Sequence, residues 1–150
     1  LKDGEPYVLE YNVRMGDPEC QPILMRMESD LFEYLMGSVS GTLDAMSPIS
    51  WKDKSAVCIV LASKGYPESY PQGDELFGLD QTFEHGFVFH AGTKKQNVKI
   101  ITNGGRVLGV TGLGDTLESA INNAYDISEK ISWENKYLRT DIGKKGLSHL

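Results

Sequence analysis

A polar stretch close to the start of the chain, Glu10-Tyr11-Asn12-Val13-Arg14, holds three side chains that could act together on a charged ligand. Successive side chains of a β-strand point to opposite faces, so Glu10, Asn12 and Arg14 would share one face of a strand. A carboxylate and a carboxamide supply oxygen ligands to Mg²⁺ alongside phosphate oxygens, and a guanidinium binds an anion through a fork of N–H donors. The pattern predicts a metal-and-anion strand. Its alternative is an exposed polar face on a half-buried strand.

The strand that would carry these side chains is predicted over residues 6–13, where apolar and polar residues alternate and β-formers are frequent. Asp17 is placed to N-cap a helix over about residues 18–27, with Pro18 at its first position. Glu19, in the first turn, suits the positive end of the helix dipole. A strand followed by a capped helix would therefore hold the polar stretch in place.

The run from Arg14 to Gln21, R-M-G-D-P-E-C-Q, resembles the signature of the phosphoribosylamine–glycine ligase family, which usually reads R-F-G-D-P-E-x-Q. These are ATP-grasp enzymes of purine biosynthesis. Met15 replaces the family's phenylalanine by another apolar side chain. Further stretches that resemble the C-terminal region of this family follow in order: Gly65-Tyr66-Pro67, Gly73-Asp74, Phe89 to Thr93, Thr102 to Leu108, and Arg139-x-Asp141-Ile142-Gly143. The resemblance covers nearly the whole chain and is specific to this ligase.

The resemblance implies roles for individual residues. Glu10 and Asn12 would bind the magnesium or manganese ions that bridge the phosphates of ATP, and Arg14 would contact ATP's transferred phosphate or the acyl-phosphate intermediate. Arg14 and Asp17 are the catalytic candidates, with Asp17 near the glycine amine or orienting Arg14. The alternatives that need no substrate are a structural salt bridge for Arg14 and helix capping by Asp17 and Glu19. The implied reaction joins 5-phosphoribosylamine to glycine with ATP, giving glycinamide ribonucleotide, ADP and phosphate.

The resemblance also implies an organisation. Residues 1–46 would end an ATP-grasp domain, and residues 47–150 would form a small C-terminal domain of antiparallel strands with a packed helix, so the fold class is α+β. In this family a glycine-rich loop and an adenine-contacting lysine precede the metal strand. We therefore expect the chain to be the C-terminal portion of a longer enzyme, to need the remainder of its ATP-grasp domain as a partner, and to be inactive alone. The alternatives are another ATP-grasp ligase or a non-catalytic folded fragment.

Apolar spacing predicts the remaining elements. In chain order they are a helix that begins after an Asp30 N-cap and fades near Gly41, a buried strand over 55–62, a long loop over 64–78, strands over 86–91, 97–102 and 106–111, and a helix over about 116–131. Asn103-Gly104-Gly105 predicts a hairpin turn between the last two strands. Asp115 or Thr116 is expected to cap the final helix, and His90 to be a buried histidine.

Composition limits the functional classes. The chain has 150 residues, of which 40% are hydrophobic and 24% charged, as in ordinary globular domains. A net charge of -6 argues against a nucleic-acid partner, which would favour a basic surface. Cys20 and Cys58 lie far apart and outside metal-type spacing, and no apolar run is long enough for a membrane helix. We expect a cytoplasmic protein with small-molecule substrates, acting on neither nucleic acid nor membranes.

Overall fold

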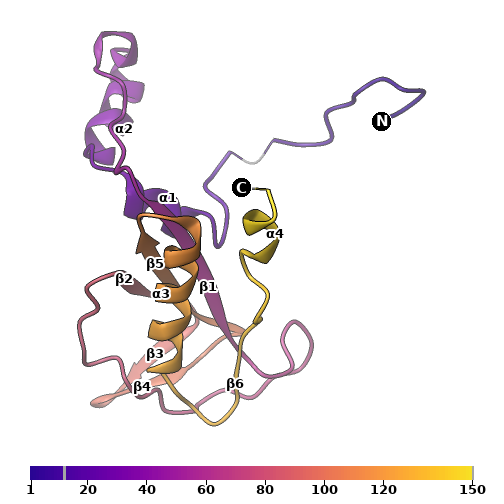
Figure 1. Cartoon of the computed structure of the whole chain (residues 1–150), viewed down its shortest axis with the longest axis vertical. Coiled ribbons are helices and arrows are strands. Elements are labelled where there is room, and N and C mark those ends of the chain that lie inside the picture. The colour runs from indigo at the N-terminus through magenta and orange to yellow at the C-terminus, as the bar shows by residue number, and fades with distance from the viewer. Residues whose placement is uncertain (12, 150) are drawn as a thin grey trace.

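The computed structural model describes residues 1–11 and 13–149. Its centre is a four-stranded antiparallel sheet in the order β2-β5-β1-β6 (Figure 1). The strands are β1 (Ser55–Ser63), β2 (Gly86–His90), β5 (Arg106–Gly114) and β6 (Lys136–Tyr137). The long central pair, β1 and β5, runs in a register that places Cys58 opposite Thr111. This arrangement confirms the α+β class and the buried strand predicted over 55–62.

One face of the sheet carries the large apolar side chains. Ile59, Leu61, Leu108 and Val110 are fully buried there, in one cluster with side chains of α3 (Leu117–Glu129). Burying apolar surface of this kind is the main favourable term in folding. The helix packs directly on β1 and β5, so this face forms the hydrophobic core of the domain.

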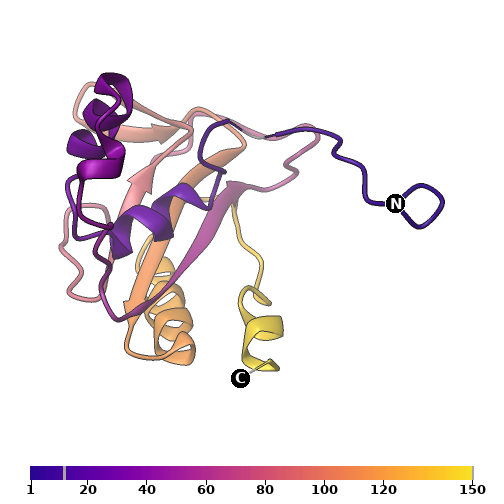
Figure 2. The ribbon, with the colours of Figure 1, turned by 90° about the horizontal axis from the view of Figure 1, so that it is seen from above.

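The opposite face carries small residues and receives α1 (Cys20–Arg26), which crosses β1 and β5 (Figure 2). A Cβ built on Gly109 would lie 3.3 Å from Cys58 Sγ and 3.6 Å from Gln21 Nε2, so strand and helix approach closely here. The helix agrees with the prediction over 18–27. Because α1 lies on the sheet, the turn that precedes it is carried over the sheet as well.

Two further helices follow their sequence signals. In α2 (Leu31–Ser40), the Asp30 carboxylate accepts a hydrogen bond from Phe32 N at 2.8 Å, and Gly41 ends the helix with φ +70°. A short 3₁₀ helix, η1 (Leu43–Ala45), follows, and this hairpin projects from the body (Figure 1). None of the described helices is long and apolar enough to cross a membrane.

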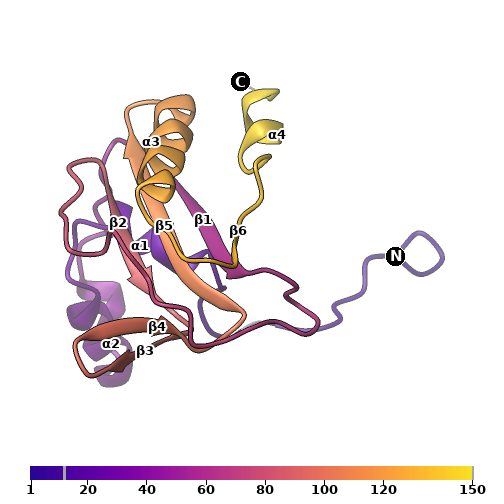
Figure 3. The same cartoon turned by 90° about the horizontal axis from the view of Figure 1, so that it is seen from below.

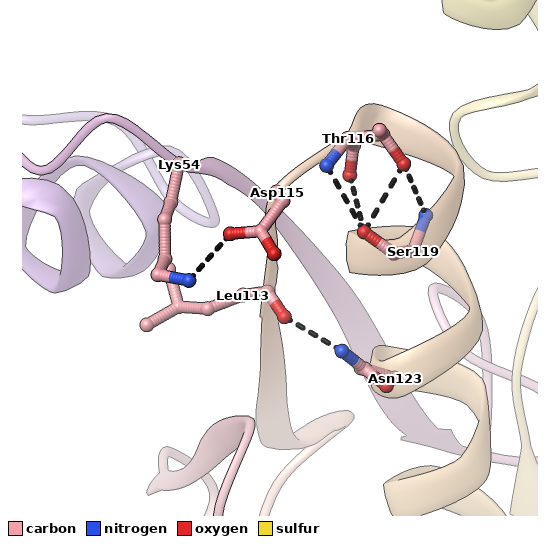
Figure 4. A network of polar contacts seen from close by, with 6 residues as sticks. All are labelled: Lys54, Leu113, Asp115, Thr116, Ser119 and Asn123. Atoms are coloured by element: carbon pink, nitrogen blue, oxygen red, sulfur yellow. Dashed lines mark hydrogen bonds and ion pairs between the residues drawn. The ribbon is translucent and has the colours of Figure 1, made fainter.

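Helix α3 begins with a capping box (Figure 4). Thr116 Oγ1 accepts from Ser119 N at 3.1 Å, and Ser119 Oγ accepts from Thr116 N at 3.0 Å. Thr116, one of the two predicted caps, is therefore the N-cap.

At the other end of α3, Lys136 Nζ donates to the carbonyls of Ser128 at 2.8 Å and Ile131 at 2.6 Å, while burial lowers the pKa of this lysine.

The predicted hairpin around Asn103–Gly105 is wrong. Strand β4 (Lys99–Thr102) pairs with β3 (Thr93–Gln96) in a separate two-stranded sheet, whereas β5 pairs with β1 and β2 (Figure 3). Neither Gly104 nor Gly105 has the positive φ that a type I′ hairpin turn requires. The segment therefore carries the chain from one sheet to the other.

The strand predicted over residues 6–13 is also wrong for the described part of that segment. Residues 6–11 and 13 are exposed, form no strand and lead away from the body (Figures 1 and 2). A strand needs a neighbouring strand to bond its N–H and C=O groups, and no described residue pairs with this segment. Asn12 lies outside the described residues.

The expectation of a buried His90 is wrong as well. Its side chain is exposed, with Nδ1 2.9 Å from Thr93 Oγ1, because β2 is an edge strand and His90 is its last residue.

Residues 64–78 form no helix or strand, as predicted for a long loop. The chain closes with the short helix α4 (Lys144–Leu147).

Candidate functional site

Arg106, the first residue of β5, binds the turn that precedes α1. Its Nη1 donates to the Asp17 carbonyl at 2.8 Å and lies 3.2 Å from the carboxylate oxygen Asp17 Oδ2. Its Nε donates to the Tyr66 hydroxyl at 3.2 Å, and its guanidinium carbon lies 5.9 Å from the centroid of the Tyr66 ring. The Tyr66 hydrogen bond, with the Asp17 charge, raises the pKa of Arg106. Three segments far apart in sequence therefore meet at one guanidinium.

The Tyr66 ring packs directly against the backbone of Gly105. A Cβ on Gly105 would overlap the Tyr66 ring, so the ring lies directly on this backbone. The Tyr66 amide donates to the Ser63 carbonyl at 3.1 Å, at the end of β1. The stretches Gly65-Tyr66-Pro67 and Thr102 to Leu108, separate in sequence, thus form one contact.

A cavity of about 270 Å³ opens beside this contact. Its lining combines two guanidinium groups, two phenol rings and the small-residue face of β1: Pro18, Cys58, Val60, Ala62, Tyr66, Arg106, Tyr137, Arg139 and Ile142. Arg139 is held in a two-bond pair with Asp141, at 2.9 Å from Nε to Oδ1 and 2.7 Å from Nη2 to Oδ2. This pair lowers the pKa of Asp141. The cavity is therefore rimmed by two cations whose orientations are fixed.

Asp17 does not cap α1, which corrects the predicted capping role. The N-cap residue is Glu19, and no side chain makes a cap hydrogen bond. The Asp17 carboxylate instead faces Arg106, and the Glu19 side chain folds over Gly16. A charged guanidinium gives a carboxylate a stronger hydrogen bond than a neutral amide does. This explains why Asp17 bonds to Arg106 and not to a backbone amide of α1.

The other predicted site residues lie on the exposed segment upstream of this turn. Glu10 is exposed, and its carboxylate makes no hydrogen bond or ion pair with any described residue. Arg14 is exposed, and among the described residues its side chain donates only to the neighbouring Met15 carbonyl, from Nη1 at 3.1 Å. Asn12 is outside the described residues. The structure thus brings Asp17 against Arg106, which lines the cavity, but does not bring Glu10 and Arg14 there.

The residue types on that segment nevertheless suit a magnesium site. A free carboxylate with a carboxamide two positions on matches the one or two protein ligands that Mg²⁺ takes when phosphates and water complete its shell. Across residues 1–11 and 13–149, no three His, Cys, Asp or Glu side chains gather as a potential metal cage. Such a site would therefore depend on phosphate oxygens for most of its ligands.

Cys58, which lines the cavity, is a free thiol whose pKa is raised, chiefly by burial. A raised pKa keeps the thiol protonated at neutral pH, and a protonated thiol is a poor nucleophile. Cys20 is also free, with its Sγ 3.4 Å from Met15 Sδ. The cavity is therefore suited to binding more than to thiol chemistry.

A second polar cluster lies at the other end of β5, where Lys54 Nζ contacts Asp115 Oδ1 at 2.6 Å (Figure 4). The Lys54 hydrogen bond lowers the pKa of Asp115. Asn123 Nδ2 donates to the Leu113 carbonyl at 2.7 Å. The Lys54 contact joins the segment before β1 to the turn after β5, and the Asn123 contact joins β5 to α3.

Sequence reasoning identified Asp17 but missed its partner Arg106, and Tyr66, which contacts Arg106. The signal was present, because both lie in stretches that resemble the ligase family. The sequence does not show which of these residues contact one another, because Arg106 and Asp17 are 89 positions apart and Arg106 and Tyr66 are 40 apart.

Comparison with known proteins agrees with the fold and the motifs. Residues 56–145 match the family model for phosphoribosylglycinamide synthetase, C domain. The chain is 46% identical over 148 residues to phosphoribosylamine–glycine ligase of Vibrio parahaemolyticus, covering 98% of this chain and 34% of that protein. It is 47% identical over 143 residues to a bifunctional purine biosynthetic protein of Pichia angusta, covering 95% of this chain and 18% of that protein.

A solved structure shows the same relationship. The crystal structure of phosphoribosylamine–glycine ligase from Thermotoga maritima superposes with a TM-score of 0.71 at 39% sequence identity, over 93% of this chain and 34% of that chain. This chain spans about a third of the length of the two ligases. Its motifs, fold and family match agree, and the chain belongs to the phosphoribosylamine–glycine ligase family, matching the model of its C domain over residues 56–145.

Proposed function

We propose that this chain supplies the C-terminal part of an ATP-dependent ligase that joins 5-phosphoribosylamine to glycine, giving glycinamide ribonucleotide, ADP and phosphate. The observation that carries the proposal is 46% identity to a phosphoribosylamine–glycine ligase over 98% of the chain. That match includes the length of chain that bears Glu10, Arg14 and Asp17. The same proposal makes the enzyme a cytoplasmic one, which the two free thiols support.

The proposed domain boundary falls near residue 46. Residues 1–46 would complete an ATP-grasp domain with sequence that precedes them, and residues 47–150 would form the C-terminal domain. Exposed apolar side chains support this division: Leu9 is 96% exposed, Val13 94% and Val39 83%. Apolar surface gathered on projecting segments is typical of an interface. The rest of the ATP-grasp domain would cover it.

Glu10 and Asn12 would hold Mg²⁺ or Mn²⁺ together with the phosphates of ATP. The metal would supply positive charge that neutralises those phosphates. The Glu10 carboxylate, which pairs with no described residue, supports this role, because a ligand that is already paired would have to give up that partner.

Arg14 would contact the phosphoryl group as it moves from ATP to the glycine carboxylate. A guanidinium has a rigid set of donors that matches phosphoryl oxygens, and its charge stays fixed at any physiological pH. Asp17 would then lie near the glycine amine or orient Arg14. The amine of 5-phosphoribosylamine attacks the acyl phosphate, a C–N bond forms, and phosphate leaves.

The cavity beside Asp17 is the candidate position for 5-phosphoribosylamine. Arg139 lines it, and its described ion pair with Asp141 leaves Arg139 Nη1 uncommitted. Guanidinium donors of this kind suit a phosphate monoester.

The test is an assay of phosphate release and product mass, with the full-length ligase and with this chain alone. We expect the full-length enzyme to form glycinamide ribonucleotide only when ATP, glycine and 5-phosphoribosylamine are all present, and the chain alone to form none. Turnover by the chain alone at about 1 s⁻¹ or more would refute the two-part site. Turnover with formate or bicarbonate in place of glycine would favour another ATP-grasp ligase.

A further inference from the structure

We infer that Arg106 and Tyr66 are positioning residues of the ligase: they anchor the Asp17 turn on the C-terminal domain and so fix where the Arg14 side chain is presented. The inference rests on the proposed function, because it assigns Arg14 to the reaction. Neither Arg106 nor Tyr66 needs to touch ATP or glycine for this role. They act through residues 15–19, the segment called here the Asp17 turn.

The contacts of Arg106 fix both the position and the orientation of this turn. One nitrogen, Nη1, reaches the backbone carbonyl of Asp17 at 2.8 Å and its carboxylate at 3.2 Å. A bond to the carbonyl holds the peptide itself, and the second contact limits rotation about the first. Arg14 lies three residues upstream, so the anchor is at most about 11 Å along the chain from the Arg14 backbone.

Tyr66 orients the guanidinium that makes these contacts. Its hydroxyl accepts from Nε at 3.2 Å, and its ring lies 5.9 Å from the guanidinium carbon, within cation–π distance. Tyr66 is fixed in turn by the bare backbone of Gly105. A chain of contacts therefore runs from the Gly105 backbone, just before β5, through Tyr66 and Arg106 to Asp17.

The Asp17 turn is the boundary between the anchored body and the free segment. Downstream of it, Cys20 N donates to Gly16 O at 2.9 Å and α1 lies on the sheet. Upstream, residues 6–11 are exposed and unpaired within the described chain. Arg106 thus holds the last fixed point before the residues proposed for catalysis, which is where an anchor would have the most effect on their geometry.

The contact is poorly suited to a purely stabilising role. The side chains of Arg106 and Asp17 are 39% and 63% exposed, and ion pairs in this setting contribute little to folding. A placement error of about 1 Å at a reacting group, in contrast, can lower a rate by about 10²-fold. Loss of the anchor should therefore affect turnover far more than folding.

The test compares Arg106→Ala, Arg106→Lys and Tyr66→Phe in the full-length ligase. We expect kcat to fall by about 10-fold or more in Arg106→Ala, with KM for ATP and the melting temperature little changed. Arg106→Lys should recover part of the loss, because an ammonium can still reach the Asp17 carbonyl. Tyr66→Phe should lower kcat less than Arg106→Ala. The matched control is Lys99→Met, which removes another exposed ion pair, Lys99–Glu75 at 2.6 Å, away from the cavity.

A second readout does not depend on activity. Hydrogen exchange at the Cys20 amide should be faster in Arg106→Ala than in wild type, since the turn that bonds it would be freed. If exchange accelerates while the wild-type enzyme makes no glycinamide ribonucleotide, the anchor stands and the proposed function fails. The positioning role is overturned if exchange at Cys20 is unchanged, or if kcat of Arg106→Ala stays within about 2-fold of wild type.

Discussion

Gly112 lies where α3 approaches the sheet most closely, and replacing it with alanine tests how the core is built. A Cβ at this position would overlap the Ala120 carbonyl oxygen and the Ala124 amide nitrogen, and would lie 2.9 Å from Ala124 Cα. All three are backbone atoms of α3, so no side-chain rotation can relieve the clash. The Gly112→Ala variant must shift either the helix or β5.

The expected cost follows from these contacts. Overpacking a core by one methyl group costs about 1–3 kcal/mol, and clashes with helix backbone alone place this site at the upper end. Alanine also restricts the unfolded chain, which offsets about 0.4–1 kcal/mol. The net loss of unfolding free energy is about 2 kcal/mol. For a chain of this size that lowers the melting temperature by about 4–8 °C.

The assay is urea unfolding followed by circular dichroism, with Gly109→Ala as the matched control. Gly109 lies on the same strand but faces α1, and its nearest neighbours are the side chains of Cys58 and Gln21. Because a side chain such as Gln21 can move, the control should change stability by less than about 1 kcal/mol. Equal urea midpoints for the two variants would refute the close approach of α3 to β5.

Two further predictions concern the edges of the same core. Thr116→Ala removes the capping box of α3 and should reduce stability by about 0.5–2 kcal/mol in the same urea assay, whereas an unchanged midpoint would show that the cap contributes nothing. The second concerns Asp115, whose folded pKa is lowered from 3.8 by the Lys54 hydrogen bond. Its contribution is present above pH 3.8 and is lost as the pH falls through the folded value. The stability difference between wild type and Lys54→Met should therefore vanish in acid, and a difference that persists would contradict this pairing.

Local signals in the sequence predicted the elements that depend on local contacts. Asp30 and Gly41 bracket α2 because a cap and a left-handed glycine act within a few residues. Thr116 begins α3 for the same reason. The continuous apolar run of β1 indicated a strand buried on both faces, which the structure confirms.

Pairings between distant segments were not predictable in this way. The glycines at 104–105 resembled a hairpin turn, yet the pairing of β4 with β3 depends on which strand lies beside it in space. Asp17 carries a local capping signal that a distant Arg106 overrides. Residues 6–13 have strand composition, but composition supplies no hydrogen-bonding partner.

In the candidate site, too, residue types were predictable and contacts between distant segments were not. Residue types and spacing predicted Glu10, Asn12, Arg14 and Asp17 as site residues, and their roles stay predictions. Glu10 and Arg14 are exposed on a segment that makes no strand pairing with other described residues. Among the described members of this set, Asp17 alone contacts a distant part of the chain, through Arg106, which Tyr66 holds in turn.

The most direct test of the account is magnesium-dependent phosphate release by the full-length ligase carrying Glu10→Gln or Asn12→Ala. The control is Glu5→Gln, which changes another exposed glutamate on the same segment. The account predicts that both site variants lose at least about 100-fold in rate with an unchanged melting temperature, while Glu5→Gln keeps the wild-type rate. A wild-type rate for either Glu10→Gln or Asn12→Ala at saturating Mg²⁺ and ATP would contradict the central claim.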